Sequence, residues 1–171
     1  VKAHSPVFNE QYQDFTVRQQ EGKKLLAEAG FKEGFQLTIH SASNHYLNDE
    51  KIVAAIAENL KAIGIQAKAE KLPTPEFLAK GDARQLSMGL VGWNSIDSDP
   101  FSPIDSFASC AKANNYRSTN WARYCNPKVD ALLKKAIEAA SEKEYFAQLK
   151  AAYGLVIGDA AYIPIHQQMN S

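Results

Sequence analysis

The feature of the sequence that most constrains the fold is an alternation of strand and helix patterns over residues 35–92. Phe35–Ser41 and Ile65–Leu72 alternate apolar with polar side chains, which is typical of strands with one wetter face. A helical pattern runs between them from Asp49, which is placed to cap the helix, to a stop at Gly64. The stretch therefore predicts a strand, a helical crossover and a second strand parallel to the first.

A third strand is predicted at Leu86–Gly92, after a short helix through Phe77 and Leu78. This stretch carries almost no charge, and its length suits a buried strand at the centre of a sheet. The sequence thus predicts an α/β fold, with a mostly parallel mixed sheet of about four or five strands flanked by helices. Ligands of open α/β sheets collect beyond the carboxyl ends of the strands, so the residues after Gly92 are candidates for a site.

The centre of this predicted site is the segment after the third strand, with Trp93, Asn94, Asp97 and Asp99. An indole ring offers a large apolar face and one N–H donor, which suits the wall of a ligand cleft as well as a core position. We expect Asp97 to contact a ligand and Asp99 to have a structural role in the turn before Pro100.

Two other segments supply candidate ligand residues. Asn44 and Tyr46 follow the first strand, so they are expected to reach the same edge of the sheet. Tyr116 and Asn120 belong to a loop region of about 25 residues after Pro100, and a loop of that length is expected to be functional or covalently tied down. Loop polarity alone would also explain these side chains.

Further helices are predicted on either side of the strand segments. The first begins near Thr16 and ends with a cap at Gly30, and two more carry the apolar positions of Val129–Ile137 and Phe146–Ile157. The last two are expected to form a helical hairpin. A short strand is predicted at Tyr162–His166, where the proline suits an edge position.

Composition favours a small, neutral partner. The 171 residues include 19 Lys and Arg against 19 Asp and Glu, so the formal net charge is zero, and no basic run provides a footprint for nucleic acid. No apolar run approaches the roughly 20 residues that span a bilayer. The chain begins without Met or a signal-peptide core, and we expect it to be part of a longer protein.

Cys110 and Cys125 are the only cysteines, and their spacing fits no metal motif, because zinc sites usually contain close pairs of ligands. A disulfide and two buried free thiols both stay open on the residues alone. His40 and His45 lack the spacing that places two ligands on one helix face. No metal and no cofactor is therefore predicted.

Catalysis receives little support from the sequence. It contains no Gly-x-Ser-x-Gly elbow, no phosphate-binding glycine loop and no His-Glu-x-x-His helix, so the prediction is a binding protein and not an enzyme. Two alternatives stay open. One is a carboxylate-dependent hydrolase that uses Asp97 and Asp99, and the other is a freestanding protein-interaction domain.

Several segments along nearly the whole chain occur in the order found in one protein family. They are Lys24-Leu-Leu-Ala-Glu-Ala-Gly-Phe, the strand Phe35–Ile39, Leu60-Lys-Ala-Ile-Gly-Ile-Gln-Ala, Gly92-Trp93 with Asp99-Pro100, Asn126-Pro-Lys-Val-Asp-Ala-Leu-Leu and Ala160-Ala-Tyr-Ile-Pro-Ile-His. Together they resemble the solute-binding proteins of bacterial ABC importers, specifically the peptide, opine and nickel class.

This resemblance implies that residues 1–171 form the C-terminal ligand-binding lobe of a monomeric, two-lobed clamp with a type II periplasmic binding protein-like fold. The clamp would bind peptides, or peptide-like or opine-like small molecules, in the periplasm, or as an extracellular, membrane-anchored protein. It would deliver them to the permease subunits of an ABC importer. The missing N-terminal lobe would be a further partner.

The resemblance also bears on two details. The dipeptide-binding branch has a cysteine pair at the same place, which implies a disulfide between Cys110 and Cys125 and an extracytoplasmic location. Peptide binders of the family place an aspartate three residues after the tryptophan to pair with the peptide amine. Here that position is Ile96, and Asp97 comes one residue later. Opines, sugars, glutathione-like compounds and metal chelates therefore stay open as solutes.

Overall fold

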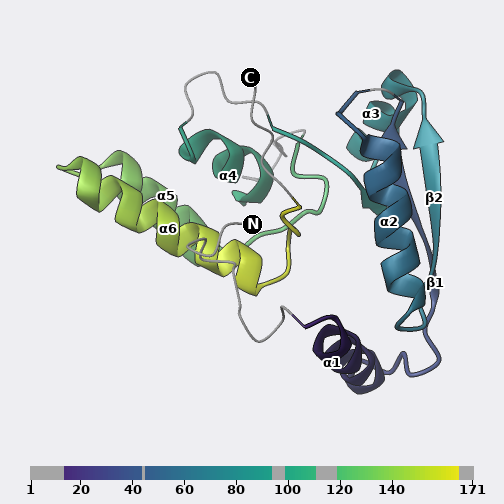
Figure 1. The fold of residues 1–171 in the computed structure, drawn as a ribbon. Helices are drawn as coiled ribbons and strands as arrows, with labels where there is room; N and C mark the ends of the chain where they lie inside the picture. Colours follow the sequence, from purple (N-terminus) through teal and green to yellow (C-terminus); the bar gives the residue numbers. More distant parts are fainter. Residues whose placement is uncertain (1–13, 44, 94–98, 111–118, 166–171) are drawn as a thin grey trace. The chain divides into compact units, whose positions relative to one another are not determined.

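The computed structural model describes residues 14–43, 45–93, 99–110 and 119–165. Figure 1 shows how its helices and strands follow one another. Their bounds are α1 Phe15–Glu28, β1 Gln36–Ala42, α2 Asp49–Lys61, β2 Gln66–Leu72, α3 Thr74–Asp82, β3 Met88–Gly89, α4 Phe101–Ala108, α5 Pro127–Ile137 and α6 Glu142–Gly158. The chain divides into two compact units, which we call the strand unit (described residues up to 92) and the helical unit (described residues from 93). No helix among the described residues is long and apolar enough to cross a membrane.

The strand unit contains a parallel sheet with the strand order β2-β1-β3. β1 and β2 pair from Gln36 opposite Gln66 to Ala42 opposite Leu72. Helix α2 connects these two strands and runs alongside them (Figure 1). Its apolar side packs on both strands, and Val53 and Ala57 share one buried cluster with Ile39 of β1 and Ala67 of β2. This arrangement confirms the predicted α/β fold with helical crossovers.

The prediction that Leu86–Gly92 forms the central strand is wrong for the described sheet. β1 is central, whereas β3 lies at the edge and pairs only Met88 with Ile39 and Gly89 with His40. The described residues also form three strands, fewer than predicted. The predicted burial is wrong as well, because residues 86–92 are all half-buried or exposed. The order of strands depends on backbone pairing, which composition does not encode.

Two glycines set the start of the β1–β2 pairing. Gly34 and Gly64 each precede their strand by two residues and have positive φ angles of 74° and 99°. A Cβ atom added to Gly34 would lie 1.9 Å from the carbonyl oxygen of Gly64, so only glycine allows the two turns to approach this closely. Next to this contact, the N–H of Gln66 donates to the carbonyl of Phe35 at 2.8 Å.

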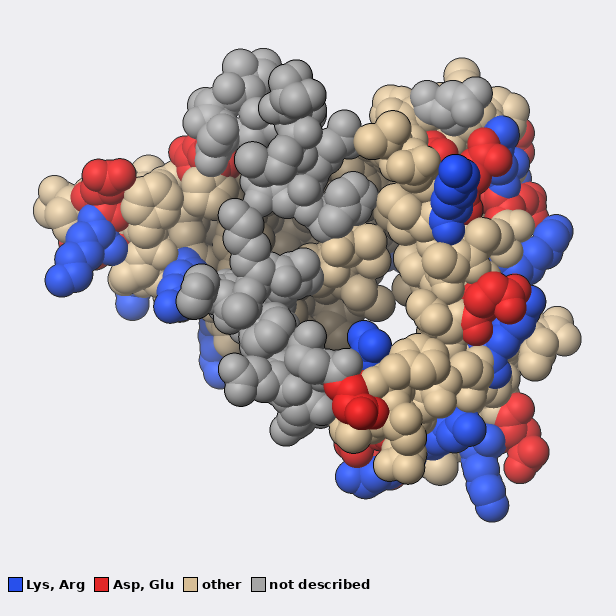
Figure 2. Space-filling model, viewed as in Figure 1, with Lys and Arg blue, Asp and Glu red and all other residues tan. Residues whose placement is uncertain are grey.

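β2 forms the other edge of the described sheet and carries alternating charges. Lys68 pairs with Glu70 at 3.1 Å, and Lys71 pairs with Glu50 of α2. Figure 2 shows basic and acidic side chains interspersed on the side of the view where β2 and α2 lie. A charged edge strand discourages pairing with strands of other molecules.

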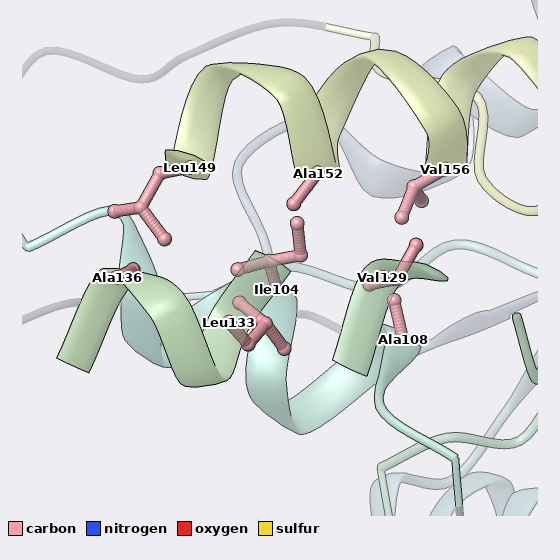
Figure 3. Close-up of a cluster of buried hydrophobic side chains, with 8 residues drawn as sticks. All are labelled: Ile104, Ala108, Val129, Leu133, Ala136, Leu149, Ala152 and Val156. Carbon is pink, nitrogen blue, oxygen red and sulfur yellow. The ribbon is translucent and has the colours of Figure 1, made fainter. Parts of the chain in front are cut away.

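The helical unit has its own core, shown in Figure 3. The buried side chains come from α4, α5 and α6, and they are Ile104, Ala108, Val129, Leu133, Ala136, Leu149, Ala152 and Val156. The Asn126 side chain caps α5 ahead of Pro127, and the Ser141 side chain caps α6. The predicted hairpin of α5 and α6 is confirmed.

Two predictions for this unit are wrong. The region after Pro100 is not a continuous loop, because α4 occupies Phe101–Ala108. Pro103 lies in the first turn of α4, where its missing N–H would have no helical partner, so it is compatible with the helix. Residues 162–165 of the expected final strand are not in a strand, and residue 166 lies outside the described residues.

A disulfide joins Cys110 to Cys125, with a Cα–Cα distance of 4.4 Å. This confirms the pairing that the family resemblance implies, and the alternative of two free thiols is wrong. The N–H of Cys110 also donates to the carboxylate of Asp130, in the first turn of α5, at 2.9 Å. This hydrogen bond connects the disulfide to α5, which contributes to the helical core.

The glycine contact predicts a difference between two alanine variants. Both Gly34→Ala and Gly30→Ala place a side chain at positive φ, which costs about 1–2 kcal/mol in each. Only at position 34 does the new Cβ meet backbone, whereas nothing lies within 4 Å at Gly30. We expect Gly34→Ala to lose about 1–3 kcal/mol more stability in urea denaturation. Equal losses would contradict the register-setting role of the contact.

Reduction of the disulfide should destabilise the protein. The bonded cysteines are 15 residues apart, and closing a loop of this size contributes about 3 kcal/mol in the chain-entropy model. For a protein of this length, the loss corresponds to a melting temperature lower by about 6–12 °C. Calorimetry with and without reductant measures it, and a Cys110→Ala/Cys125→Ala variant, which reductant should leave unchanged, is the control. Two titratable thiols in oxidised, unfolded protein would contradict the pairing.

Candidate functional site

Trp93 begins the helical unit and lies at the end of a row of three aromatic rings. Its ring meets that of Phe107 on α4 with a centroid distance of 5.4 Å and an interplanar angle of 75°. The Phe107 ring is in turn 5.4 Å from that of Tyr162. Trp93 is still 40% exposed, so it lies at the surface and is not a core residue. Phe107 contacts either an edge or a face of its ring.

Asp99 anchors the chain a few residues after Trp93. Its Oδ1 accepts from the N–H of Phe101 at 2.8 Å, and both carboxylate oxygens accept from the hydroxyl of Tyr145 on α6, at 2.7 and 2.8 Å. The hydroxyl of Tyr153, two helical turns along α6, donates to the carbonyl of Pro100 at 3.0 Å. Burial and the Asp99 charge raise the pKa of Tyr153, so this hydroxyl keeps its proton. The structural role predicted for Asp99 is confirmed.

In the strand unit, the carboxyl ends of β1 and β2 are fastened to one another. The backbone N–H and the hydroxyl of Ser43 both donate to the carbonyl of Leu72, each at 2.8 Å. The hydroxyl of Thr74, the first residue of α3, donates to the carbonyl of Ser43 at 3.4 Å. The loop that follows β1 therefore starts from a fixed point at this edge of the sheet.

Tyr46 lies in this loop and packs on Gly92, the residue before Trp93. Its hydroxyl donates to the Gly92 carbonyl at 3.4 Å, and a Cβ atom added to Gly92 would lie only 2.7 Å from its ring. Close packing of the ring thus requires glycine at position 92. A shallow hollow of about 560 Å³ is lined by residues 45–51 at this edge. These contacts agree with the expectation from the sequence that Tyr46 reaches the edge of the sheet at which the third strand ends.

The predicted capping role of Asp49 needs a correction. Asn48 takes the N-cap position of α2 with a φ of 57°, and Asp49 is the first helical residue. Asp49 is 3% exposed, and its carboxylate accepts from the N–H groups of His45 and Tyr46 at 3.2 and 3.3 Å. Asp49 therefore folds the loop back on the helix and holds Tyr46 beside it.

Asn120 supports the end of the disulfide-closed loop. It is 2% exposed, and its amide donates to the carbonyls of Ser109 and Tyr124 at 3.2 and 2.8 Å. Its amide oxygen accepts from the N–H of Tyr124 at 3.1 Å. These bonds engage both ends of the amide, so Asn120 shapes the loop. Its contact with a ligand stays a prediction.

A second contact fastens the same loop to the end of α6. The hydroxyl of Tyr124 and the amide of Asn126 both donate to the carboxylate of Asp159, at 2.7 and 2.8 Å. Burial and this carboxylate raise the pKa of Tyr124 to about 12, and the same hydrogen bonds lower the pKa of Asp159. The loop is thus held by a disulfide at one place and by a hydrogen-bonded carboxylate at another.

Four of the predicted ligand residues lie outside the described residues, and they are Asn44, Asn94, Asp97 and Tyr116. The described residues include Trp93, Tyr46 and Asn120, in the positions given above. Among the described residues, no three His, Cys, Asp or Glu side chains gather where they could hold a metal ion.

Sequence reasoning missed the side chains that support the candidate residues. Phe107 and Tyr162 support Trp93, and Tyr145 and Tyr153 hold the segment after it. One signal was available, because Tyr145 and Tyr153 are eight residues apart and therefore share a face of a helix. Their partners lie about 50 residues away in the sequence, and no local pattern identifies them.

Comparison with known proteins identifies the family. Residues 1–115 match bacterial extracellular solute-binding proteins, family 5 Middle, so the chain belongs to this family. The match includes the strand unit and Trp93 with its partner Phe107.

Among curated proteins, heme-binding protein A of Haemophilus influenzae is 28% identical over 92% of this chain. The alignment covers 29% of that protein, so the chain spans less than a third of its length.

Solved structures share the fold. The ABC transporter-associated periplasmic binding protein DppA from Helicobacter pylori, in complex with the peptide STSA, has a TM-score of 0.75 and 26% identity. It aligns with 90% of this chain and 30% of its own length. A dipeptide-binding protein from Pseudoalteromonas sp. SM9913, in complex with Met-Leu, has a TM-score of 0.75 and 25% identity, over 94% of this chain and 32% of its own.

The Asp99 anchor predicts a loss of stability on removal of one hydroxyl. Tyr145→Phe leaves the carboxylate without its two side-chain contacts at 2.7 and 2.8 Å, and a hydrogen bond to a partly buried charge is worth about 1–2 kcal/mol. Urea denaturation measures the change. Tyr46→Phe, which removes an exposed hydroxyl bond of 3.4 Å, should cost little and serves as the control. Equal effects of the two variants would refute a special role for Asp99.

Proposed function

We propose that this chain is the C-terminal ligand-binding lobe of an extracytoplasmic solute-binding protein that serves an ABC importer. The observation that carries the proposal is the family match over residues 1–115, which includes the strand unit and the exposed Trp93. The relatives named above are binding proteins, and the Helicobacter pylori protein is described as periplasmic and ABC transporter-associated. A solute-binding role agrees with the absence of a recognised catalytic motif in the sequence.

The proposed solutes are peptides or peptide-like or opine-like small molecules. Two of the similar structures hold peptides, STSA and Met-Leu, and a curated relative is named for heme. The part of the site on this chain is proposed to consist of Trp93, Asn94, Asp97, Asn44, Tyr46, Tyr116 and Asn120. The indole of Trp93 would pack on an apolar side chain of the solute, and Asp97 would pair with a cationic group.

The proposal requires a second wall. Ligand sites bury about 70–90% of the ligand surface, and two-lobed proteins achieve this by closing around it. An N-terminal lobe outside this chain would provide that wall and part of the specificity. The complete protein would work as a monomer in the periplasm, or anchored outside the membrane, and would pass its solute to the permease subunits.

One alternative is a hydrolase that uses Asp97 and Asp99. In the structure the Asp99 carboxylate accepts from Tyr145 and from the backbone of Phe101, which gives it a structural task. A freestanding protein-interaction domain is the other alternative. The family match favours solute binding over both.

Native mass spectrometry of the complete gene product, purified without refolding, tests the function. We expect a bound molecule with the mass of a peptide or a peptide-like compound, which is lost on unfolding. Trp93→Ala should lower the occupied fraction, because it removes the proposed wall. Steady product formation from the retained molecule would instead support an enzyme. A complete protein that binds no small molecule but captures a protein would support the interaction domain.

A further inference from the structure

We propose that Phe107 and Tyr162 are positioning residues that hold the ring of Trp93 as a wall of the solute site. The inference rests on the proposed function, since it assigns a task to side chains behind a residue that we place in contact with solute. Neither Phe107 nor Tyr162 follows a strand end, and neither belongs to the ligand residues proposed above.

The rings of Trp93 and Phe107 meet edge to face. At an interplanar angle of 75°, the edge of one ring meets the face of the other. Whichever ring supplies the edge, Phe107 covers at most one face of the indole. Trp93 is 40% exposed, so the contact supports the ring and leaves apolar surface for a ligand.

Phe107 is fixed by its place on α4 and by Tyr162. It lies near the end of α4, one residue before Ala108, which is fully buried in the helical core. The hydroxyl of Tyr162 donates to the backbone carbonyl of Phe107 at 2.9 Å, while the two rings meet at 5.4 Å. Tyr162 itself packs against the core.

The Tyr162 hydroxyl is the donor in this bond. Burial raises the pKa of Tyr162 to about 12, so the hydroxyl keeps its proton and acts as a donor. A continuous series of contacts therefore leads from the buried core through Tyr162 and Phe107 to Trp93.

A positioned ring is useful in a binding wall. A free tryptophan side chain on a surface samples several rotamers, and fixing one rotamer on binding costs part of the affinity. Contacts behind Trp93 remove this cost before the solute arrives. An aromatic pair contributes about 0.5–1.5 kcal/mol beyond area burial, which corresponds to a change in solute affinity of about two- to tenfold.

The test compares Phe107→Leu with Phe146→Leu. Each variant loses one phenyl ring with an edge-to-face partner, Trp93 at 5.4 Å in the first and Tyr145 at 5.3 Å in the second. In the solute-free 171-residue chain, the NMR signal of the Trp93 indole N–H should move in the first variant and stay in place in the second. In the complete gene product, Phe107→Leu should weaken Met-Leu binding about two- to tenfold more than Phe146→Leu does.

A second pair of variants removes only one hydroxyl group each and is therefore less disruptive to folding. Tyr162→Phe removes only the hydroxyl that bonds Phe107, and Tyr124→Phe removes a hydroxyl bond to Asp159 of similar length. Only Tyr162→Phe should shift the Trp93 signal. Calorimetric melting of all four variants shows whether a change in binding merely follows stability.

The possible results separate the inference from the function on which it rests. If Phe107→Leu affects the Trp93 signal and Met-Leu binding no more than Phe146→Leu does, the positioning role is wrong, even if Trp93→Ala abolishes binding. If Trp93→Ala binds Met-Leu as well as the unaltered protein does, the proposed wall is wrong. If the unaltered complete protein does not bind Met-Leu, a dipeptide solute is wrong, and the NMR comparison still decides whether the ring is positioned.

Discussion

The strand unit depends on the close approach of two backbone turns at Gly34 and Gly64. Because these glycines lie opposite one another two residues before their strands, they set the register in which β1 and β2 pair. A slip of one residue would turn Ile39 from the core to the opposite face of the sheet. The same register brings Ser43 onto the carbonyl of Leu72 at the far end. The position of the loop with Tyr46 thus follows from a contact at the other end of the strands.

In the helical unit, the described residues that border the candidate ligand segments are fixed in a different way. There the segment after Trp93 and the disulfide-closed loop both begin and end at residues with tertiary contacts. Trp93 contacts Phe107 at one end of the first segment, and Asp99 accepts from Tyr145 at the other. Cys110 and Cys125 close the second. Binding residues on loops with a rigid scaffold can differ between relatives without loss of the fold, which suits a family whose members are named for different solutes.

Sequence patterns predicted the elements whose signals are local. The α2, α5 and α6 helices were found from apolar spacing, and β1 and β2 from alternation. α4 was missed because polar residues and Pro103 obscure its short apolar face. The edge position of β3 and the Tyr145–Asp99 contact depend on pairings between distant segments, which no window of sequence contains. Sequence patterns thus named candidate ligand residues, whose contact with a solute stays a prediction, and missed the side chains that support Trp93 and Asp99.

The alternating charges of β2 matter for how concentrated solutions of the protein behave. A chain with a formal net charge of zero has no long-range repulsion between copies. Copies of the chain must then be kept apart by short-range free-energy costs at the surfaces where two copies could associate. An added strand along β2 would have to dehydrate the Lys68–Glu70 pair and Lys71, which pairs with Glu50 of α2. Colloidal stability in this neutral protein thus depends on where its charges lie along one strand.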